Sequence, residues 1–414
     1  MLFDRLDRRA CGYRELRALN PHNATISVIV PTYNRPQLLV QALESVLGQT
    51  RPANEIVVVD DGSDAATATA VGNFRGRIGY VYQSNAGKAA AINQALNRVT
   101  GDYVCIVDDD DLLALDAFEQ HLDFLSQRPD LHFSYSGVWY FDGLGPPPPS
   151  SKCRRFERDA VPPEDFLISA MELFPCVLQS MLVPRKCYSE VGVFDETLSR
   201  GQDYDMILRL AARFRGAKLP RPTTFVRTHA GERGPARERH RATERESVWR
   251  SYDKRIFLKL RQSLPLLQYL PARSCNEAMT PPERRRALLQ RACIMARHGL
   301  IGESVRDLYD AVGQLPGVGF SKEELAICSR LFSASPARFT GHETLLREVG
   351  IYLHRMAPSL WRAAAVGAYW RFISELKAGC VADAGRAGVN FLRLTGVRRL
   401  PTLALEKTRR RALT

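Results

Sequence analysis

The sequence of 414 residues lacks the patterns of several common protein classes. Its nine cysteines include no CxxC pair, so neither a disulfide framework nor a zinc site is indicated, and we expect reduced thiols. No run of about 18 uncharged apolar residues is present, and the apolar stretch 363–370 lies between Arg362 and Arg371. Because 45% of the residues are hydrophobic, the chain can still bury the cores of two or three domains.

An export signal and an even distribution of charge are also missing. The first sixteen residues alternate charged and apolar side chains without the apolar segment of a signal peptide, so we expect a cytoplasmic location. Residues 1–254 contain 32 lysines and arginines against 33 acidic residues, whereas residues 255–414 contain 26 against 12. Such a basic segment suits nucleic acid, an anionic membrane surface or a solvated helical face.

Strand and helix patterns alternate in the first half of the chain. Strand patterns, with nearly continuous apolar character, occupy residues 26–34, 55–62, 77–83 and 102–109, and helix patterns occupy 36–49 and 87–99. Pro36 suits the first turn of its helix. This order predicts an α/β fold with a Rossmann-like, mostly parallel sheet flanked by helices. Ligands bind such sheets beyond the carboxyl ends of the strands.

The rest of the chain predicts a second, helical region. Further elements are expected at 114–127 (helix), 132–142 (strand), 177–184 (strand), 203–216 (helix) and 223–229 (strand). The segment 230–255 is highly charged, and the pattern beyond residue 256 is helical throughout. We therefore predict three parts: an N-terminal extension at 1–25, an α/β domain at 26–240 and a basic α-helical domain at 241–414.

Four consecutive aspartates, Asp108 to Asp111, follow a strand with an apolar sequence. Two carboxylates about 5 Å apart repel by about 3 kcal/mol at an effective dielectric constant near 20, so the run favours a bound cation. Mn²⁺ and Mg²⁺ prefer carboxylate oxygens, and Asp108 and Asp110 at a strand end suit a metal-nucleotide site. A helix N-cap explains one or two aspartates without any ligand, and Asp111 is the best placed for that role.

Other polar motifs have both a structural and a functional interpretation. Asp61 follows a strand in "DDGS", where it can cap a turn or accept a hydrogen bond from a nucleobase. Asp203 and Asp205 lie at a helix start, where carboxylates are stabilised whatever their function, although a catalytic base also needs such a fixed position. Lone residues such as Lys88 and His229 decide nothing alone, and the "GK" at Lys88 is not part of a P-loop.

Together these motifs resemble a known family. In order, "SVIVPTYNRPQLLVQALESVLGQT", "EIVVVDDGSDAAT", "QSNAGKAAAINQALNRVTGDYVCIVDDDDLL", "LVPRKCYSEVGVFDETLSRGQDYDMILRL" and "VRTHAG" closely resemble the inverting nucleotide-sugar glycosyltransferases of family 2. The resemblance spans roughly residues 26–232 and implies the GT-A fold. The QxxRW motif and membrane spans of processive members are absent, so a single sugar addition is expected.

The resemblance also implies roles for particular residues. The donor-binding positions fall on Pro31, Thr32, Tyr33, Asp61, Lys88 and Asp109. The family's DxD motif falls on Asp108 and Asp110, which would bind Mn²⁺ or Mg²⁺, and His229 falls on a position that can approach the metal or the diphosphate. The catalytic base falls on Asp203. Gln202 replaces the glutamate that usually precedes this base, which removes a charge beside it.

The expected activity is transfer of one sugar from a nucleoside-diphosphate sugar, a UDP-sugar by preference, to a hydroxyl group of a saccharide or lipid-linked saccharide. A non-catalytic sugar-nucleotide-binding protein of the same fold, with a tail that binds membrane or nucleic acid, is the alternative. The tail carries no nucleic-acid motif, so no nucleic-acid partner is expected. Its arginines alternate with Trp361, Trp370 and leucines, which favours peripheral contact at the inner face of a membrane.

Overall fold

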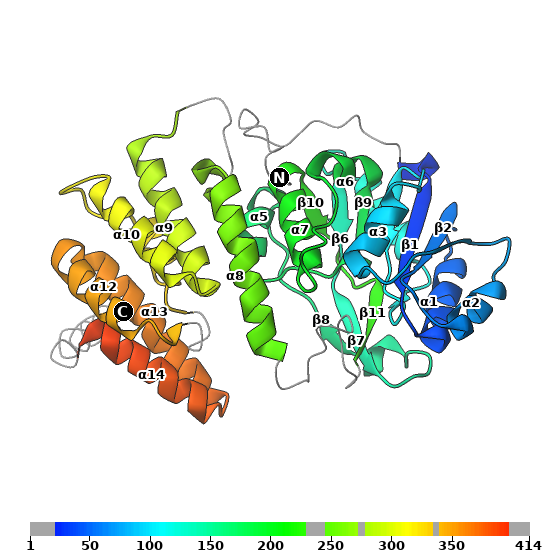
Figure 1. Ribbon diagram of the computed structural model, residues 1–414. Helices are drawn as coiled ribbons and strands as arrows, with labels where there is room; N and C mark the ends of the chain where they lie inside the picture. The colour runs from blue at the N-terminus through cyan, green and yellow to red at the C-terminus, as the bar shows by residue number, and fades with distance from the viewer. Residues whose placement is uncertain (1–20, 229–244, 272–277, 334–338, 397–414) are drawn as a thin grey trace. The chain divides into compact units, whose positions relative to one another are not determined.

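The computed structural model describes residues 21–228, 245–271, 278–333 and 339–396 (Figure 1). The chain divides into two compact units, Met1–Tyr252 and Asp253–Thr414. This division lies C-terminal to the boundary predicted between residues 240 and 241, within the charged segment 230–255. Each unit has a hydrophobic core of its own.

A seven-stranded sheet forms the centre of the first unit (Figure 1). Its strands, in spatial order, are Gly216–Lys218 (β10), Phe133–Tyr135 (β6), Met181–Pro184 (β9), Tyr103–Ile106 (β4), Ile26–Thr32 (β1), Glu55–Asp60 (β2) and Gly79–Tyr82 (β3). Strand β1 is parallel to β2 and β4, β2 to β3 and β6 to β10, whereas β9 is antiparallel to β4 and β6. The predicted mostly parallel sheet is thus confirmed.

Helices cover this sheet, as the sequence predicted. They are Pro36–Leu47 (α1), Ala65–Gly72 (α2), Lys88–Leu96 (α3), Ala117–Ser126 (α4), Phe166–Glu172 (α5), Arg185–Val191 (α6) and Gln202–Arg213 (α7). Pro36 occupies the first turn of α1, where its missing N–H costs no hydrogen bond. Leu39 and Leu43 of α1 pack with Val28 and Val30 of β1 in one buried core. This packing fixes α1 against β1.

A second, four-stranded sheet contains Leu112–Leu113 (β5), Thr224–Thr228 (β11), Val138–Asp142 (β7) and Arg154–Phe156 (β8), in that order. The single strand predicted at 132–142 is therefore wrong, because β6 and β7 belong to different sheets. The chain leaves the first sheet at Ser136, whose N–H donates to the Ser180 carbonyl at 2.9 Å. At Gly137 a Cβ atom would lie 2.6 Å from Glu157 Cβ, so the close approach of β8 needs glycine.

The second unit is helical, as predicted. Its elements are the end of Arg245–Ser263 (α8), Pro281–Arg297 (α9), Ile301–Gly313 (α10), Lys322–Cys328 (α11), Glu343–Met356 (α12), Pro358–Lys377 (α13) and Val381–Thr395 (α14). Close packing is visible at Gly367 of α13, where a Cβ atom would lie 1.7 Å from the Ser329 carbonyl oxygen. No helix in the described parts of the chain is long and apolar enough to cross a membrane.

Candidate active site

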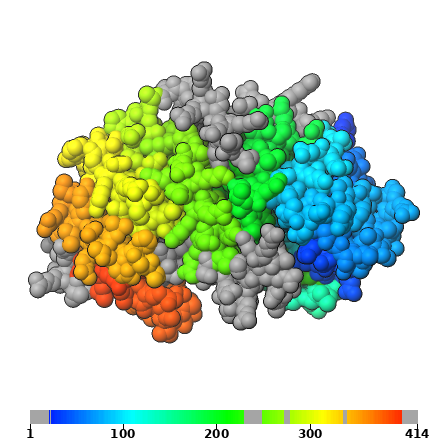
Figure 2. All heavy atoms as spheres, in the orientation of Figure 1, coloured from blue at the N-terminus to red at the C-terminus, as the bar shows by residue number. Residues whose placement is uncertain are grey.

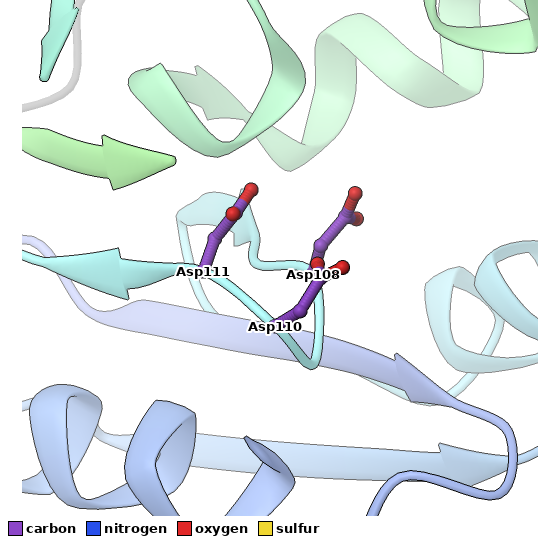
Figure 3. A group of neighbouring side chains, drawn as sticks. All are labelled: Asp108, Asp110 and Asp111. Carbon is purple, nitrogen blue, oxygen red and sulfur yellow. The ribbon is translucent and has the colours of Figure 1, made fainter. Parts of the chain in front are cut away.

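The candidate site lies beyond the carboxyl ends of β1, β2 and β4. Because these three strands are parallel neighbours, the segments after Thr32, Asp60 and Ile106 emerge at the same edge of the sheet. In Figure 3 the carboxylates of Asp108, Asp110 and Asp111 project from the loop between β4 and β5. One oxygen of each lies within 4.8 Å of the others. The aspartate run is therefore a cluster in space as well as in sequence.

Asp108 and Asp110 contact cationic side chains from different elements. The Lys88 ammonium group, at the start of α3, lies 2.5 Å from Asp108 Oδ1. Arg35, between β1 and α1, donates from Nη1 to Asp110 Oδ2 at 2.8 Å. Burial opposes the charge on Lys88, but the carboxylates of Asp108, Asp203 and Asp110 outweigh it and raise its pKa. Lys88 thus stays cationic beside the cluster.

Asp109 ties the aspartate loop to the end of β1. Its Oδ2 accepts hydrogen bonds from Thr32 Oγ1 at 2.8 Å and from the Tyr33 N–H at 3.3 Å, and its Oδ1 accepts from Arg35 at 3.0 Å. Burial raises the pKa of Asp109 to about 6, against the opposing effect of Arg35. Pro31, one residue earlier, is buried in the β1–β2 ladder. The structure therefore brings Pro31, Thr32, Tyr33 and Asp109 together.

The predicted helix cap at Asp111 is wrong. Strand β5 follows this residue directly, and α4 starts only at Ala117, after Asp116. Asp111 is buried; its Oδ2 accepts from Gln179 Nε2 at 2.5 Å and its Oδ1 from the Arg227 N–H at 2.9 Å. Burial raises its pKa well above that of an ordinary aspartate. Asp111 thus joins the loop to β11 and to the turn before β9.

Arg227, on β11, fixes the aspartate loop from behind. This guanidinium group is 1% exposed and donates from Nε to the Asp110 carbonyl oxygen at 3.0 Å. It also donates to the carbonyl oxygens of Gly143 and Gly145, and to Gln41 Oε1 of α1 at 2.9 Å. Four segments of the chain meet at this one side chain. Arg227 therefore positions the loop, because the acceptors of its hydrogen bonds are backbone carbonyl oxygens and the Gln41 side chain of the protein itself.

Asp61 holds a loop that faces the same edge of the sheet. Its carboxylate accepts hydrogen bonds from the N–H groups of Ala86 and Gly87, both at 2.8 Å, and from Gln83 Nε2 at 2.7 Å. Gly62, with φ of 85°, allows this approach, since a Cβ atom there would lie 2.7 Å from the Asn85 nitrogen. The loop leads into Lys88, so Asp61 places the start of α3 next to Asp108.

Asp203 and Asp205 differ sharply although they share the first turn of α7. Asp205 is buried in an ion pair with Arg209 at 2.8 Å, and Arg209 also donates to the carbonyl oxygens of Val191 and Gly192. The half-buried Asp203 accepts a hydrogen bond from the Tyr204 N–H at 2.8 Å. Burial raises the pKa of Asp203, against the opposing charge of Lys88. The ion pair with Arg209 gives Asp205 a structural role, whereas the ion pairs among the described residues do not include Asp203.

Three residues of the site were not identified from the sequence: Arg35, Gln179 and Arg227. Each contacts the aspartate run from a distant segment, and Gln179 Nε2 donates to both Asp108 Oδ2, at 3.0 Å, and Asp111. The arginine in "TYNRP" stands next to predicted donor-binding residues and could have been singled out. Arg227 lies within the "VRTHAG" motif, but that motif drew attention to His229, and nothing in the sequence near Gln179 indicates such contacts. The predicted metal ligand His229 lies outside the described residues.

The donor atoms of the cluster fit a hard divalent cation. They are carboxylate oxygens at the spacing given above, which Mn²⁺ and Mg²⁺ favour. Within the described residues, Lys88 and Arg35 form ion pairs with Asp108, Asp109 and Asp110, so three carboxylates face two side-chain cations. Asp108 and Asp110 are the residues whose carboxylates would hold such an ion.

Comparisons with known proteins agree with the geometry of the site. The family model described as glycosyl transferase family 2 matches residues 27–171. An uncharacterized glycosyltransferase of Rickettsia conorii is 30% identical over 203 residues, which cover 48% of this chain and 33% of that protein. Glycosyltransferase GlyA of Streptococcus pneumoniae serotype 4 is 38% identical over 131 residues, which cover 29% of this chain and 19% of GlyA.

These matches cover a third or less of the length of both relatives. Among solved structures, S. aureus TarS 1–349 aligns with 86% of this chain and 92% of its own, at 16% identity and a TM-score of 0.48. The family match falls on the parallel strands and aspartate loop described above, as the five sequence motifs predicted. The segment 27–171 therefore matches glycosyltransferase family 2, and the mostly parallel sheet of the first unit agrees with the GT-A fold that the resemblance implies.

Proposed function

We propose that the protein transfers a single sugar from a nucleoside-diphosphate sugar, by preference a UDP-sugar, to a hydroxyl group of a saccharide or lipid-linked saccharide, with inversion of configuration. The observation that carries this proposal is the arrangement of Lys88, which lies against Asp108 and within electrostatic range of Asp203. A group for the leaving diphosphate and a candidate base are thus close together. The match to family 2 supports the same class of reaction.

In this proposal the donor lies along the strand ends. Thr32, Tyr33 and the loop held by Asp61 would contact the nucleoside, and the Lys88 ammonium group would stabilise negative charge on the leaving diphosphate. A divalent cation held by Asp108 and Asp110 would supply additional positive charge at the diphosphate. Asp109 and Asp111 are engaged by Thr32, Gln179 and Arg227, so we propose that they shape the loop.

Asp203 would act as the general base. It would take the proton from the acceptor hydroxyl while that oxygen attacks the anomeric carbon, and the nucleoside diphosphate would leave from the opposite face. Burial raises its pKa, which strengthens it as a base, and the charge of Lys88 opposes that rise. Gln202, in place of a glutamate, avoids a second negative charge next to this carboxylate.

The test replaces Asp203 by asparagine in the full-length protein. Removal of a general base is expected to reduce donor turnover by about 10² to 10⁴, with little change in donor affinity, and EDTA should abolish turnover in the wild type. An Asp203→Asn variant that keeps most of its activity would refute the assigned base. If the wild type binds a UDP-sugar but never turns it over with any acceptor, the non-catalytic alternative is correct.

The basic helical unit would contact an anionic membrane surface. Along α13 an exposed stripe contains Arg362, Val366, Trp370 and Lys377, with Trp370 54% exposed. Apolar side chains flanked by basic ones are typical of helices that lie at a lipid surface. Pelleting with phosphatidylglycerol vesicles, but not with phosphatidylcholine vesicles, would support a peripheral cytoplasmic enzyme. Stronger binding to DNA than to either vesicle would contradict this location.

A further inference from the structure

Strands β7 and β8 are neighbours in the second sheet (Figure 1). One face of this pair combines arginines with aromatic rings. The Arg154 guanidinium carbon lies 4.5 Å from the centre of the Tyr140 ring, and that of Arg158 lies 5.2 Å from the centre of the Phe156 ring. The two rings are 5.9 Å apart. We call Arg154, Tyr140, Phe156 and Arg158 the arginine–aromatic face. Alternating residues of a strand share a face, so Arg155 points the other way.

The two faces of β8 differ in how their charges are neutralised. Arg155 forms an ion pair with Glu157 at 2.8 Å, and Glu157 also pairs with Lys218. Arg154 and Arg158, in contrast, form no ion pair with any described residue. Arg158 Nε is buried and has no hydrogen-bond partner in the described part of the chain. Two guanidinium groups on one face thus retain unused hydrogen-bond donors.

The arginine–aromatic face is linked to the candidate active site through buried residues of the second sheet. Strand β11 lies beside β7, and Val226 of β11 is paired with Tyr140, so both side chains share that face. Thr224, two residues earlier on the same face, donates from Oγ1 to the Gln179 carbonyl oxygen at 3.0 Å. Gln179 in turn donates to Asp108 and Asp111. From β11 to β8 is two strand spacings, about 10 Å.

The chemistry of this face suits an anionic saccharide. The partly exposed tyrosine and phenylalanine rings lie beneath the guanidinium groups and add apolar surface beside them, which suits the C–H groups of a sugar. Guanidinium groups bind phosphate and carboxylate groups in a bidentate manner, and their stacking on rings limits the conformational freedom lost on binding. We infer that the arginine–aromatic face binds the acceptor, and that this acceptor is a saccharide or polyol that carries phosphate or carboxylate groups. The inference rests on the transferase function proposed above.

Edge strands also carry basic residues because they prevent pairing with other chains. That role would make Arg154, Arg155 and Arg158 equivalent, since all three lie on or next to the same edge strand. A recognition role makes Arg154 and Arg158 different from Arg155. The matched control for the inference is therefore Arg155→Gln, which removes one positive charge from the opposite face.

The test measures binding of three probes to the full-length protein with UDP and Mn²⁺ present. The probes are glucose 6-phosphate, glucuronate and the neutral methyl glucoside, and calorimetry or saturation-transfer NMR gives their affinities. We expect one or both anionic probes to bind at least tenfold more tightly than methyl glucoside, and their ranking identifies phosphate or carboxylate. Arg154→Gln/Arg158→Gln should remove this advantage, whereas Arg155→Gln should change it less than twofold.

Equal binding of all three probes by the wild type would overturn the inference. So would a loss of affinity in Arg155→Gln as large as that in the double variant. Circular dichroism and the affinity for UDP establish that each variant is folded with an intact donor site. Failure of the inference is distinguishable from failure of the proposed function, because the probe affinities are measured without turnover, whereas the proposed function is tested separately by Asp203→Asn with both arginines intact.

Discussion

Both units contain buried aspartates, but their charges are neutralised to different extents. In the helical unit Asp307 is completely buried, and its two oxygens pair with Arg261 at 2.5 Å and with Arg291 at 2.7 Å. In the first unit, among the described residues, Lys88 pairs with Asp108 and Arg35 pairs with both Asp109 and Asp110. One carboxylate has two cations in one unit, whereas three carboxylates have two cations in the other.

This difference separates charge that stabilises a fold from charge that binds a ligand. A carboxylate saturated by arginines has no capacity for another cation, so its effect is confined to stability. An excess of carboxylates costs stability until a cation is bound; the pKa values of Asp109 and Asp111 are raised first by burial and further by the neighbouring aspartates. The same contrast occurs in α7, where Asp205 pairs with Arg209 and Asp203 remains available.

Substitution at Asp307 should have the largest effect on stability. Asp307→Asn removes the carboxylate that Arg291 pairs with and leaves Arg261 with Glu303 alone in a largely buried site, and is expected to reduce the free energy of unfolding by about 3 to 5 kcal/mol. Chemical denaturation measures this loss. Asp310→Asn, on the exposed side of the same helix, should change it by less than about 0.5 kcal/mol. Equal effects of the two variants would show that the ion pairs of Asp307 do not stabilise the helical unit.

Metal binding should have the next largest effect. At a Mn²⁺ concentration 100 times the dissociation constant, the ion should stabilise the wild type by about 2.7 kcal/mol, because it neutralises carboxylates that otherwise repel one another. Thermal unfolding with and without EDTA measures the shift. The double variant Asp108→Asn/Asp110→Asn should show none. A shift of the same size in that variant would locate the ion elsewhere.

The smallest effect is expected from a single aspartate of the cluster in the absence of metal. Asp110→Asn weakens one contact with the partly exposed Arg35, which keeps Asp109, and relieves repulsion from Asp108 and Asp111. These effects oppose each other, so the free energy of unfolding should change by less than about 1 kcal/mol. Denaturation in EDTA checks this value. A loss of the size predicted for Asp307→Asn would show that the two clusters are alike.

The fold was largely predictable because its central strands are continuous apolar runs. β1, β2 and β4 are buried on both sides, so nearly every residue in them is apolar. Surface strands and helices alternate apolar with polar residues and are harder to recognise. The strand at 132–142 was not resolved into β6 and β7, because the break depends on contacts of Ser136 and Gly137 with distant segments. Local sequence patterns contain no information about such contacts.

The residues of the candidate site that could be predicted are those in motifs at the end of a strand or the start of a helix. Asp108, Asp110, Asp61 and Lys88 follow or precede regular elements in recognisable motifs, and the structure brings them together. The cap assigned to Asp111 failed because β5 intervenes before α4 and joins β11, a pairing set by tertiary structure. Gln179 and Arg227 were missed for the same reason, since each contributes through long-range contacts with the aspartate loop.

Calorimetric titration of UDP into the protein tests the central claim most directly, namely that the aspartate run binds a metal-nucleotide. Binding is measured with Mn²⁺ and with EDTA, for the wild type, for Asp108→Asn/Asp110→Asn and for Asp307→Asn at a temperature where it is folded. We predict binding that requires Mn²⁺ in the wild type, is lost in the double variant and is unchanged in Asp307→Asn. UDP affinity that is equal in EDTA and Mn²⁺, or unaffected by the double substitution, would contradict the account.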